Sequence, residues 1–130
     1  MARRIAHQGT KFSIAFAQQR SGACPGGEFF DGLDKPDQAK VMALFLLAGE
    51  GKFSNPEKFG NLGDGLYEFK SFKIRMPYAH SGSERGVIVV THGFIKKSNK
   101  APKEEIARAR RIYEEDQKPS GLKVVPKKKQ

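Results

Sequence analysis

Two β-rich stretches joined by a glycine-containing turn constrain the fold of this chain more than any other feature. The first covers residues 66–76, and the second, residues 87–94, is an apolar run rich in β-branched side chains. Strands normally carry few lysines, yet residues 66–100 hold seven lysines and arginines against two glutamates. Cations interleaved with aromatic residues on a sheet are typical of a surface that holds phosphates and stacks bases. The two stretches therefore predict a long antiparallel hairpin with a basic face.

The first half of the chain predicts a strand followed by two helices. Apolar residues alternate with small ones over residues 11–18, which indicates a strand. A short helix is expected at 28–33. Asp34, with a second aspartate three residues later, resembles a capping box, and the apolar residues behind it recur at helical spacing to about residue 48. The glycine-rich residues 49–65 are expected to form a loop.

The second half predicts one more helix and a tail. Pro77 lacks an N–H, so the strand before it should end there or lie at a sheet edge. Pro102 is expected to open a helix that runs to about residue 116. Residues 1–118 then form a single domain, and the lysine-rich residues 119–130 form a mobile tail.

Size and charge narrow the class of protein. The chain has 130 residues and a formal net charge of +10, which favours nucleic acid, an anionic membrane or an acidic protein as a partner. Cys24 is the one cysteine, so no intramolecular disulfide can form, which fits a reducing compartment. The longest apolar run is too short to span a bilayer, and no signal peptide is expected. The expected location is the cytoplasm, with no membrane partner.

Strand alternation places Lys73 and Arg75 on the more open face of the first stretch. Lys70 and Phe72 lie on the other face, and Phe72 is expected to point into the core. Two residues at i and i+2 lie roughly 7 Å apart along a strand, which suits the phosphate and sugar oxygens of one nucleotide. The competing interpretation, a solvated face with edge-protecting lysines, is equally favoured by this pattern alone.

His92 stands in the second stretch, followed by a glycine, and Lys96 and Lys97 come soon after. A lone histidine in an apolar strand is more often hydrogen-bonded in place than catalytic, although its near-neutral pKa suits proton transfer. The three histidines have no ligand-like spacing, so no metal site is expected. The lysines of the tail serve either RNA binding or solubility.

Several pieces of the sequence resemble, in order, the RelE/HigB-type toxins of bacterial and phage toxin–antitoxin systems. The pieces are Leu-Gly-Asp-Gly-Leu-Tyr-Glu-Phe at 62–69, a basic strand, Val-Val-Thr-His-Gly-Phe-Ile-Lys-Lys at 89–97, Lys-Ala-Pro at 100–102 and Glu-Ile-Ala-Arg-Ala at 105–109. The His-Gly-Phe-Ile-Lys-Lys run is the distinctive part and is similar to the phage-derived branch of this superfamily. Residues 72–78 depart from the usual Tyr-Arg-Ile-Phe-Tyr-like pattern, so the position of the family arginine is ambiguous by two residues.

The resemblance implies an α+β fold: a small twisted antiparallel sheet with an N-terminal helical hairpin and a C-terminal helix. It also implies a metal-independent endoribonuclease that needs no cofactor and cleaves mRNA, often on the ribosome, with a cognate helix-turn-helix antitoxin as partner. Matched by motif, Lys73 and Arg75 would stabilise the phosphorane and His92 would be base or acid. RNA would be held by the remaining candidates, Lys70, Tyr78, Lys96 and Lys97.

Two other classes of function remain open. A non-catalytic relative would use the same basic face to grip nucleic acid or a protein target such as gyrase. A structural phage protein or ribosome-associated protein is favoured by charge alone.

Overall fold

The computed structural model describes residues 3–98 and 102–118, so the expected tail at 119–130 lies outside the described residues. The elements follow one another as β1 (Ile5–Gln8), β2 (Ser13–Phe16), α1 (Pro25–Gly32), α2 (Lys35–Gly49), β3 (Phe59–Gly63), β4 (Leu66–Ser71), β5 (Ile74–His80), β6 (Val87–Val90), β7 (Phe94–Ile95) and α3 (Lys103–Gln117).

The strands form one seven-stranded sheet in the order β1-β2-β6-β5-β4-β3, with β7 pairing to β5 beyond the end of β6. Strand β2 runs parallel to β6, and the other strand pairs in the described residues are antiparallel. The expected α+β class is confirmed, with its helical hairpin and its C-terminal helix, and it is consistent with a RelE-like fold. The sheet is mixed because β2 lies beside β6 and runs parallel to it.

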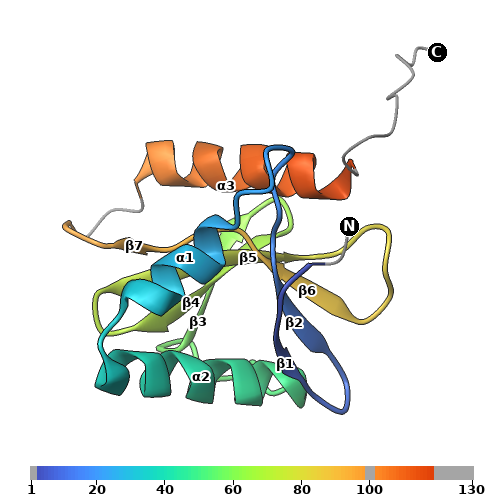
Figure 1. Ribbon diagram of the computed structural model, residues 1–130. Helices are drawn as coiled ribbons and strands as arrows, with labels where there is room; N and C mark the ends of the chain where they lie inside the picture. Colours follow the sequence, from blue (N-terminus) through green and yellow to red (C-terminus); the bar gives the residue numbers. More distant parts are fainter. Residues whose placement is uncertain (1–2, 99–101, 119–130) are drawn as a thin grey trace.

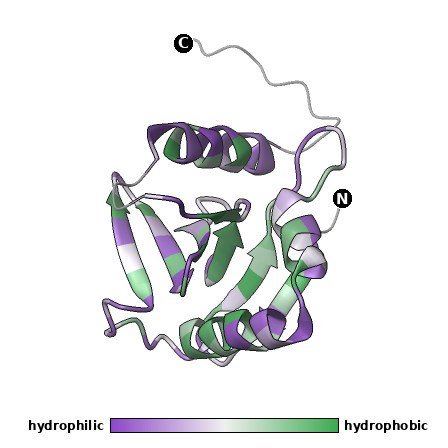
Figure 2. Ribbon diagram, turned by 90° about the vertical axis from the view of Figure 1, so that its left-hand side faces the viewer, coloured by the Kyte–Doolittle hydropathy of each residue, from purple (hydrophilic) through white to green (hydrophobic). Residues whose placement is uncertain are grey.

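Helices cover both faces of the sheet (Figure 1). Helices α1 and α2 pack on one face over the main core, which is centred on Phe16, Phe45 and Phe69. Helix α3 lies on the other face and buries little apolar surface, chiefly Ala109 and Ile112. Figure 2 accordingly shows α3 coloured mainly as hydrophilic, with hydrophobic bands between. Below, the two sides of the sheet are called the α2 face and the α3 face.

Local sequence signals account for α2. The Asp34 side chain accepts a hydrogen bond from the backbone N–H of Asp37 at 3.0 Å, which satisfies one of the free donors at the helix start. Val41, Phe45 and Ala48 then recur on the buried side of the helix. The start and the buried face predicted for this helix are both confirmed.

The continuous strand expected over residues 66–76 is wrong. The chain turns back after Ser71, and β4 and β5 form a hairpin in which Ser71 pairs with Ile74. Phe72 and Lys73 are the two residues of the turn, and Phe72 has a φ of 59°. Glycine and asparagine are the usual residues in such turns, so Phe-Lys gave no turn signal. The turn therefore reverses which side chains of β4 and β5 share a face, compared with the continuous strand expected.

Three other elements differ from expectation. Strand β1 was not expected, and β3 lies within residues 49–65, which were expected to be a loop. Strand β5 continues through Pro77, which was expected to end a strand or lie at an edge. The carbonyl oxygen of Pro77 accepts the N–H of Thr91, where β6 has ended and β7 has not begun. In an antiparallel strand, the backbone N and O of one residue point to the same side. Those of Pro77 point towards the gap between β6 and β7, so its missing N–H interrupts no strand pairing.

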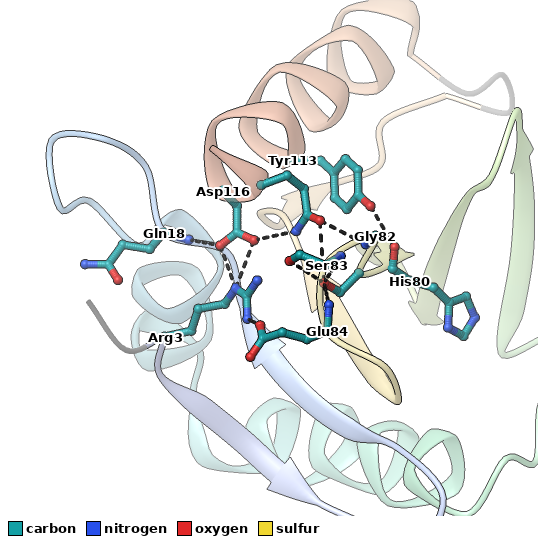
Figure 3. A network of polar contacts seen from close by, with 10 residues as sticks. Arg3, Gln18, His80, Gly82, Ser83, Glu84, Tyr113 and Asp116 are labelled. Atoms are coloured by element: carbon teal, nitrogen blue, oxygen red, sulfur yellow. Dashed lines mark hydrogen bonds and ion pairs between the residues drawn. The ribbon is translucent and has the colours of Figure 1, made fainter. Parts of the chain in front are cut away.

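A polar network attaches the end of α3 to the rest of the molecule (Figure 3). The buried carboxylate of Asp116 accepts hydrogen bonds from Arg3 Nε at 2.8 Å and 2.9 Å and from the backbone N–H of Gln18 at 2.9 Å. Arg3 also contacts Glu84 on the β5–β6 loop. The hydroxyl of Tyr113 donates to the carbonyl oxygen of His80 at 2.7 Å. These polar contacts therefore help to hold α3 against the sheet.

Candidate nucleic-acid interface

Lys70 and Arg75 lie opposite each other on neighbouring strands. They are a register pair of β4 and β5, and side chains of such a pair share one face of the sheet. Ile74 and Met76, on either side of Arg75, belong to the core of the α2 face. Arg75 and Lys70 therefore lie on the α3 face. The two cations were expected on opposite faces, and the unseen turn at Phe72 is the reason for the difference.

Glu68 lies among these cations, two residues before Lys70 on the same face. Burial raises the pKa of Glu68 above its usual range, against the opposing positive charges of Arg75, Lys70 and Lys96. Its carboxylate reaches over β3, where a Cβ added at Gly60 would lie 3.1 Å from Glu68 Oε2. We call Glu68, Lys70, Arg75 and Lys96 the Glu68 cluster. Glu68 could have been found from the sequence, since alternation along residues 66–70 places it on the face of Lys70.

Arg75 is held by the backbone of its own hairpin. Its Nη1 donates to the carbonyl oxygen of Phe72 at 2.6 Å and to that of Ile74 at 3.0 Å. Its Nε is buried and has no hydrogen-bond acceptor among the described residues. A buried unpaired donor costs about 1–3 kcal/mol.

The other lysines proposed for RNA gather at the same end of the sheet. The backbone N–H of Lys96 donates to the carbonyl oxygen of Lys73 at 2.8 Å, which brings the segment after β7 against the β4–β5 turn. Lys73 and Lys97 are exposed. The structure thus brings five of the seven predicted residues to one end of the hairpin: Lys70, Lys73, Arg75, Lys96 and Lys97.

His92 lies near this cluster but is buried. Its ring stacks against Phe94, the register partner of Arg75, with centroids 5.7 Å apart. The side chain is 1 % exposed, with Nδ1 3.0 Å from Thr91 Oγ1 and Nε2 2.9 Å from Glu105 Oε1. Both contacts are satisfied in a neutral ring whose Nε2–H donates to Glu105 and whose Nδ1 accepts the Thr91 hydroxyl.

Burial lowers the pKa of His92, against the hydrogen bond to Glu105, and the charges of Arg108 and Arg111 on α3 lower it further. The imidazole is therefore kept neutral, and with both nitrogens engaged it has no free nitrogen to offer to an RNA. The next residue, Gly93, faces α1, where an added Cβ would lie 2.1 Å from the ring of Phe29. The absence of a side chain at Gly93 thus lets the ring of Phe29 pack against the backbone.

Tyr78 lies in the core, on the opposite face from Arg75. It is 3 % exposed and stacks on Phe69 with ring centroids 4.4 Å apart. Burial raises the pKa of Tyr78 above its ordinary value. Its ring forms the floor of a pocket of about 350 Å³ with Phe53, Phe59, Gly60, Asn61, Tyr67 and His80. Tyr78, which was predicted to bind RNA, thus lies buried on the α2 face, whereas the Glu68 cluster lies on the α3 face.

Phe72 was expected in the core and is instead 91 % exposed at the tip of the β4–β5 hairpin. Arg75 donates a hydrogen bond to its carbonyl oxygen, and Lys73 is the other residue of the turn. The error has the same origin as the strand error, since the turn went unrecognised.

Two structural findings concern other classes of site. Within residues 3–98 and 102–118, no three His, Cys, Asp or Glu side chains come together as a set of metal ligands. In the same part of the chain, none of the helices has the length and apolar character that crossing a bilayer requires.

Fold and site together define a small α+β domain with clustered cations at one end of a mixed sheet. The chain belongs to the family described as Phage derived protein Gp49-like (DUF891), whose model matches residues 28–114. This phage-derived family is toxin-like and is associated with toxin–antitoxin systems. The match extends from α1 into α3 and contains the whole Glu68 cluster, whereas β1 and β2 precede it. No curated protein matches the chain significantly.

Proposed function

We propose that this protein is the toxin of a toxin–antitoxin pair and acts as a metal-independent endoribonuclease on mRNA in the cytoplasm. The observation that carries the proposal is the cross-strand pair Lys70 and Arg75 beside Glu68. Cleavage of RNA through its own 2′-OH needs a base and cations that stabilise the phosphorane. The Glu68 cluster contains both kinds of group.

In the proposed reaction the ribose 2′-oxygen attacks the adjacent phosphorus. A bond forms between O2′ and phosphorus while the bond to O5′ breaks, which leaves a 2′,3′-cyclic phosphate and a 5′-OH. The Glu68 carboxylate takes the proton of the 2′-OH, since a raised pKa makes it a better base. A lysine ammonium of the cluster returns a proton to O5′. Arg75 and Lys70 stabilise the charge on the phosphorane.

The remaining candidates take supporting roles. Lys73, Lys96 and Lys97 bind the phosphates that flank the cleaved linkage. His92 holds the β6–β7 segment against α3 through Glu105, and the role of base passes from His92 to Glu68. The ribosome presents the mRNA, and a helix-turn-helix antitoxin neutralises the toxin; these two partners are proposed from the resemblance.

A short pulse of expression followed by mapping of RNA ends tests the proposal. Wild-type protein should arrest growth and create new 5′-OH ends, and Lys70→Ala with Arg75→Ala should abolish both effects. The matched control is Lys40→Ala with Arg85→Ala, which removes two exposed cations outside the Glu68 cluster. Equal toxicity of the cluster variant and wild type would refute the assignment.

One observation favours a second function. Because the imidazole of His92 is buried and engaged, the site lacks an exposed histidine for proton transfer. A non-catalytic toxin that grips nucleic acid or gyrase is compatible with this site. Growth arrest with intact RNA and damaged DNA would establish the gyrase alternative.

A further inference from the structure

The tip of the β4–β5 hairpin exposes an aromatic ring that folding does not require. Phe72 is 91 % exposed, whereas the other large hydrophobic residues exposed in the described chain, Leu46, Ile5 and Ile95, are 46–53 % exposed. Its ring thus remains almost entirely in water.

The backbone of Phe72 is also unfavourable for a phenylalanine. Its φ of 59° lies in the left-handed region, where a side chain with a Cβ meets steric resistance. Glycine is the usual residue where the first position of a two-residue hairpin turn has a positive φ. Phe72 therefore combines a strained backbone with an exposed ring. Residues that the surrounding structure holds in a strained backbone conformation cluster at functional sites.

The hairpin holds Phe72 firmly despite the strain. Arg75 Nη1 donates to the Phe72 carbonyl oxygen at 2.6 Å, so a residue of the Glu68 cluster also fixes the turn. On the other side of the turn, the Lys96 N–H donates to the Lys73 carbonyl oxygen at 2.8 Å. The ring is thus presented from a fixed backbone with cations before and after it in the sequence.

We propose that Phe72 is a stacking platform for an unpaired base of single-stranded RNA, next to the phosphate held by Arg75. This inference rests on the proposed function, because it names how the same site holds its substrate. A single ring on a two-residue tip offers too little apolar surface for a protein interface, but one ring face suffices to stack a base. The surrounding cations complement the RNA backbone on either side of that base.

The chain contains no tryptophan, which provides a direct test. Phe72→Trp introduces one tryptophan at the tip, and Leu46→Trp introduces one at an exposed site on α2 as the matched control. The probe is a ten-nucleotide unstructured RNA with 2′-O-methyl groups, which binds without the attacking hydroxyl. We expect saturable quenching of the tryptophan emission in Phe72→Trp and unchanged emission in Leu46→Trp.

A second measurement uses the anisotropy of the same RNA carrying a fluorescent label. Phe72→Leu, which keeps an apolar side chain without a ring face, should bind about ten-fold or more weakly than wild type, as expected for loss of one stacked base. Phe72→Gly, which relieves the backbone strain, should lose affinity to a similar degree while remaining folded.

The outcomes separate this inference from the nuclease proposal. Bound RNA with unchanged emission in Phe72→Trp, or wild-type affinity in Phe72→Leu, would overturn the stacking platform even where unmodified RNA is cleaved. Quenching in Phe72→Trp, together with no new 5′-OH ends after pulsed expression of wild type, would overturn the nuclease and leave the platform standing. Absence of any RNA binding by wild type would overturn the platform, whereas new 5′-OH ends in the same protein would leave the nuclease standing.

Discussion

His92 on the β6–β7 connection and Glu105 on α3 are joined through Nε2 and Oε1, which lie 2.9 Å apart. The imidazole is buried at this contact. One side chain thus ties the segment that leads to Lys96 to the helix that covers the α3 face. This relationship makes the attachment of α3 dependent on pH.

Lowering the pH should destabilise the protein through His92. Burial lowers the pKa of this histidine below the ordinary 6.5, so the unfolded chain binds a proton that the folded chain resists. The free energy of unfolding should therefore be highest above pH 6.5 and fall as the pH drops towards the lowered pKa, by up to about 1.4 kcal/mol per pH unit. Urea unfolding between pH 7.5 and 5.5 measures this slope. His92→Gln should reduce it and His80→Gln, at an exposed histidine, should not; equal slopes in all three proteins would contradict the prediction.

Replacing Phe72 by glycine should stabilise the fold. Glycine adopts a φ of 59° without steric cost, so Phe72→Gly should raise the free energy of unfolding by about 1 kcal/mol relative to Phe72→Ala. The alanine variant is the control because it removes the ring and keeps the strain. Urea unfolding of the two variants decides the matter, and a glycine variant no more stable than the alanine variant would argue against strain at this turn.

Glu68→Gln should separate catalysis from binding. Loss of the base should slow RNA cleavage about 100-fold or more, whereas 2′-O-methyl RNA should bind at least as tightly because a negative charge has been removed. In wild type, cleavage should fall as acid protonates Glu68, at a pH above its ordinary 4.5 because its pKa is raised. Glu57→Gln, at an exposed glutamate, serves as control. Full activity in Glu68→Gln would exclude this carboxylate as the base.

A methyl group at position 93 should collide with α1. In Gly93→Ala the new Cβ would lie 2.1 Å from the Phe29 ring, so about 2 kcal/mol of stability should be lost. The double variant Gly93→Ala with Phe29→Ala should lose less stability than the sum of the losses in the two single variants. Gly32→Ala is the matched control, because nothing lies within 4 Å of an added Cβ there. Strict additivity of the two substitutions in thermal unfolding would show that the two residues do not contact each other.

Removing the Asp116 carboxylate should loosen α3. Its side chain is 1 % exposed and pairs with Arg3, so Asp116→Ala leaves a partly buried guanidinium with only the exposed Glu84 as partner and should cost about 3 kcal/mol. Glu114→Ala, an exposed position on the same helix, should cost little. Hydrogen exchange along α3 would report the loosening, and unchanged protection in Asp116→Ala would contradict it.

The elements that sequence reasoning predicted best are those with complete local signals. Helix α2 has its cap at Asp34 and a periodic apolar face. Of the strand expected over residues 87–94, the first half is the buried strand β6 (Val87–Val90), whereas the pairing breaks after Val90 and resumes in the short β7. By contrast, the pairing of β2 with β6 is set by tertiary packing and leaves no local trace. The turn at Phe72 was missed for a different reason, since the residue there contradicts local turn preference.

The same missed turn at Phe72 also led to an error in the predicted site. Lys70 and Arg75 were both identified, yet they were assigned to opposite faces because side-chain parity reverses across a turn. Tyr78 was assigned to RNA binding from the family resemblance, and its burial against Phe69 is a result of tertiary packing. The burial of His92 depends on α3 and Glu105, which sequence spacing does not reveal.

The parallel pairing of β2 with β6 has a consequence for biosynthesis. Ile14 pairs with Ile88, which the ribosome adds about seventy residues later. Strands β1 and β2 therefore cannot join the rest of the sheet until β6 has been synthesised. By contrast, β3, β4 and β5 can pair earlier as neighbouring hairpins. The members of the Glu68 cluster span residues 68 to 96, so a polypeptide that stops before Lys96 lacks part of the cluster.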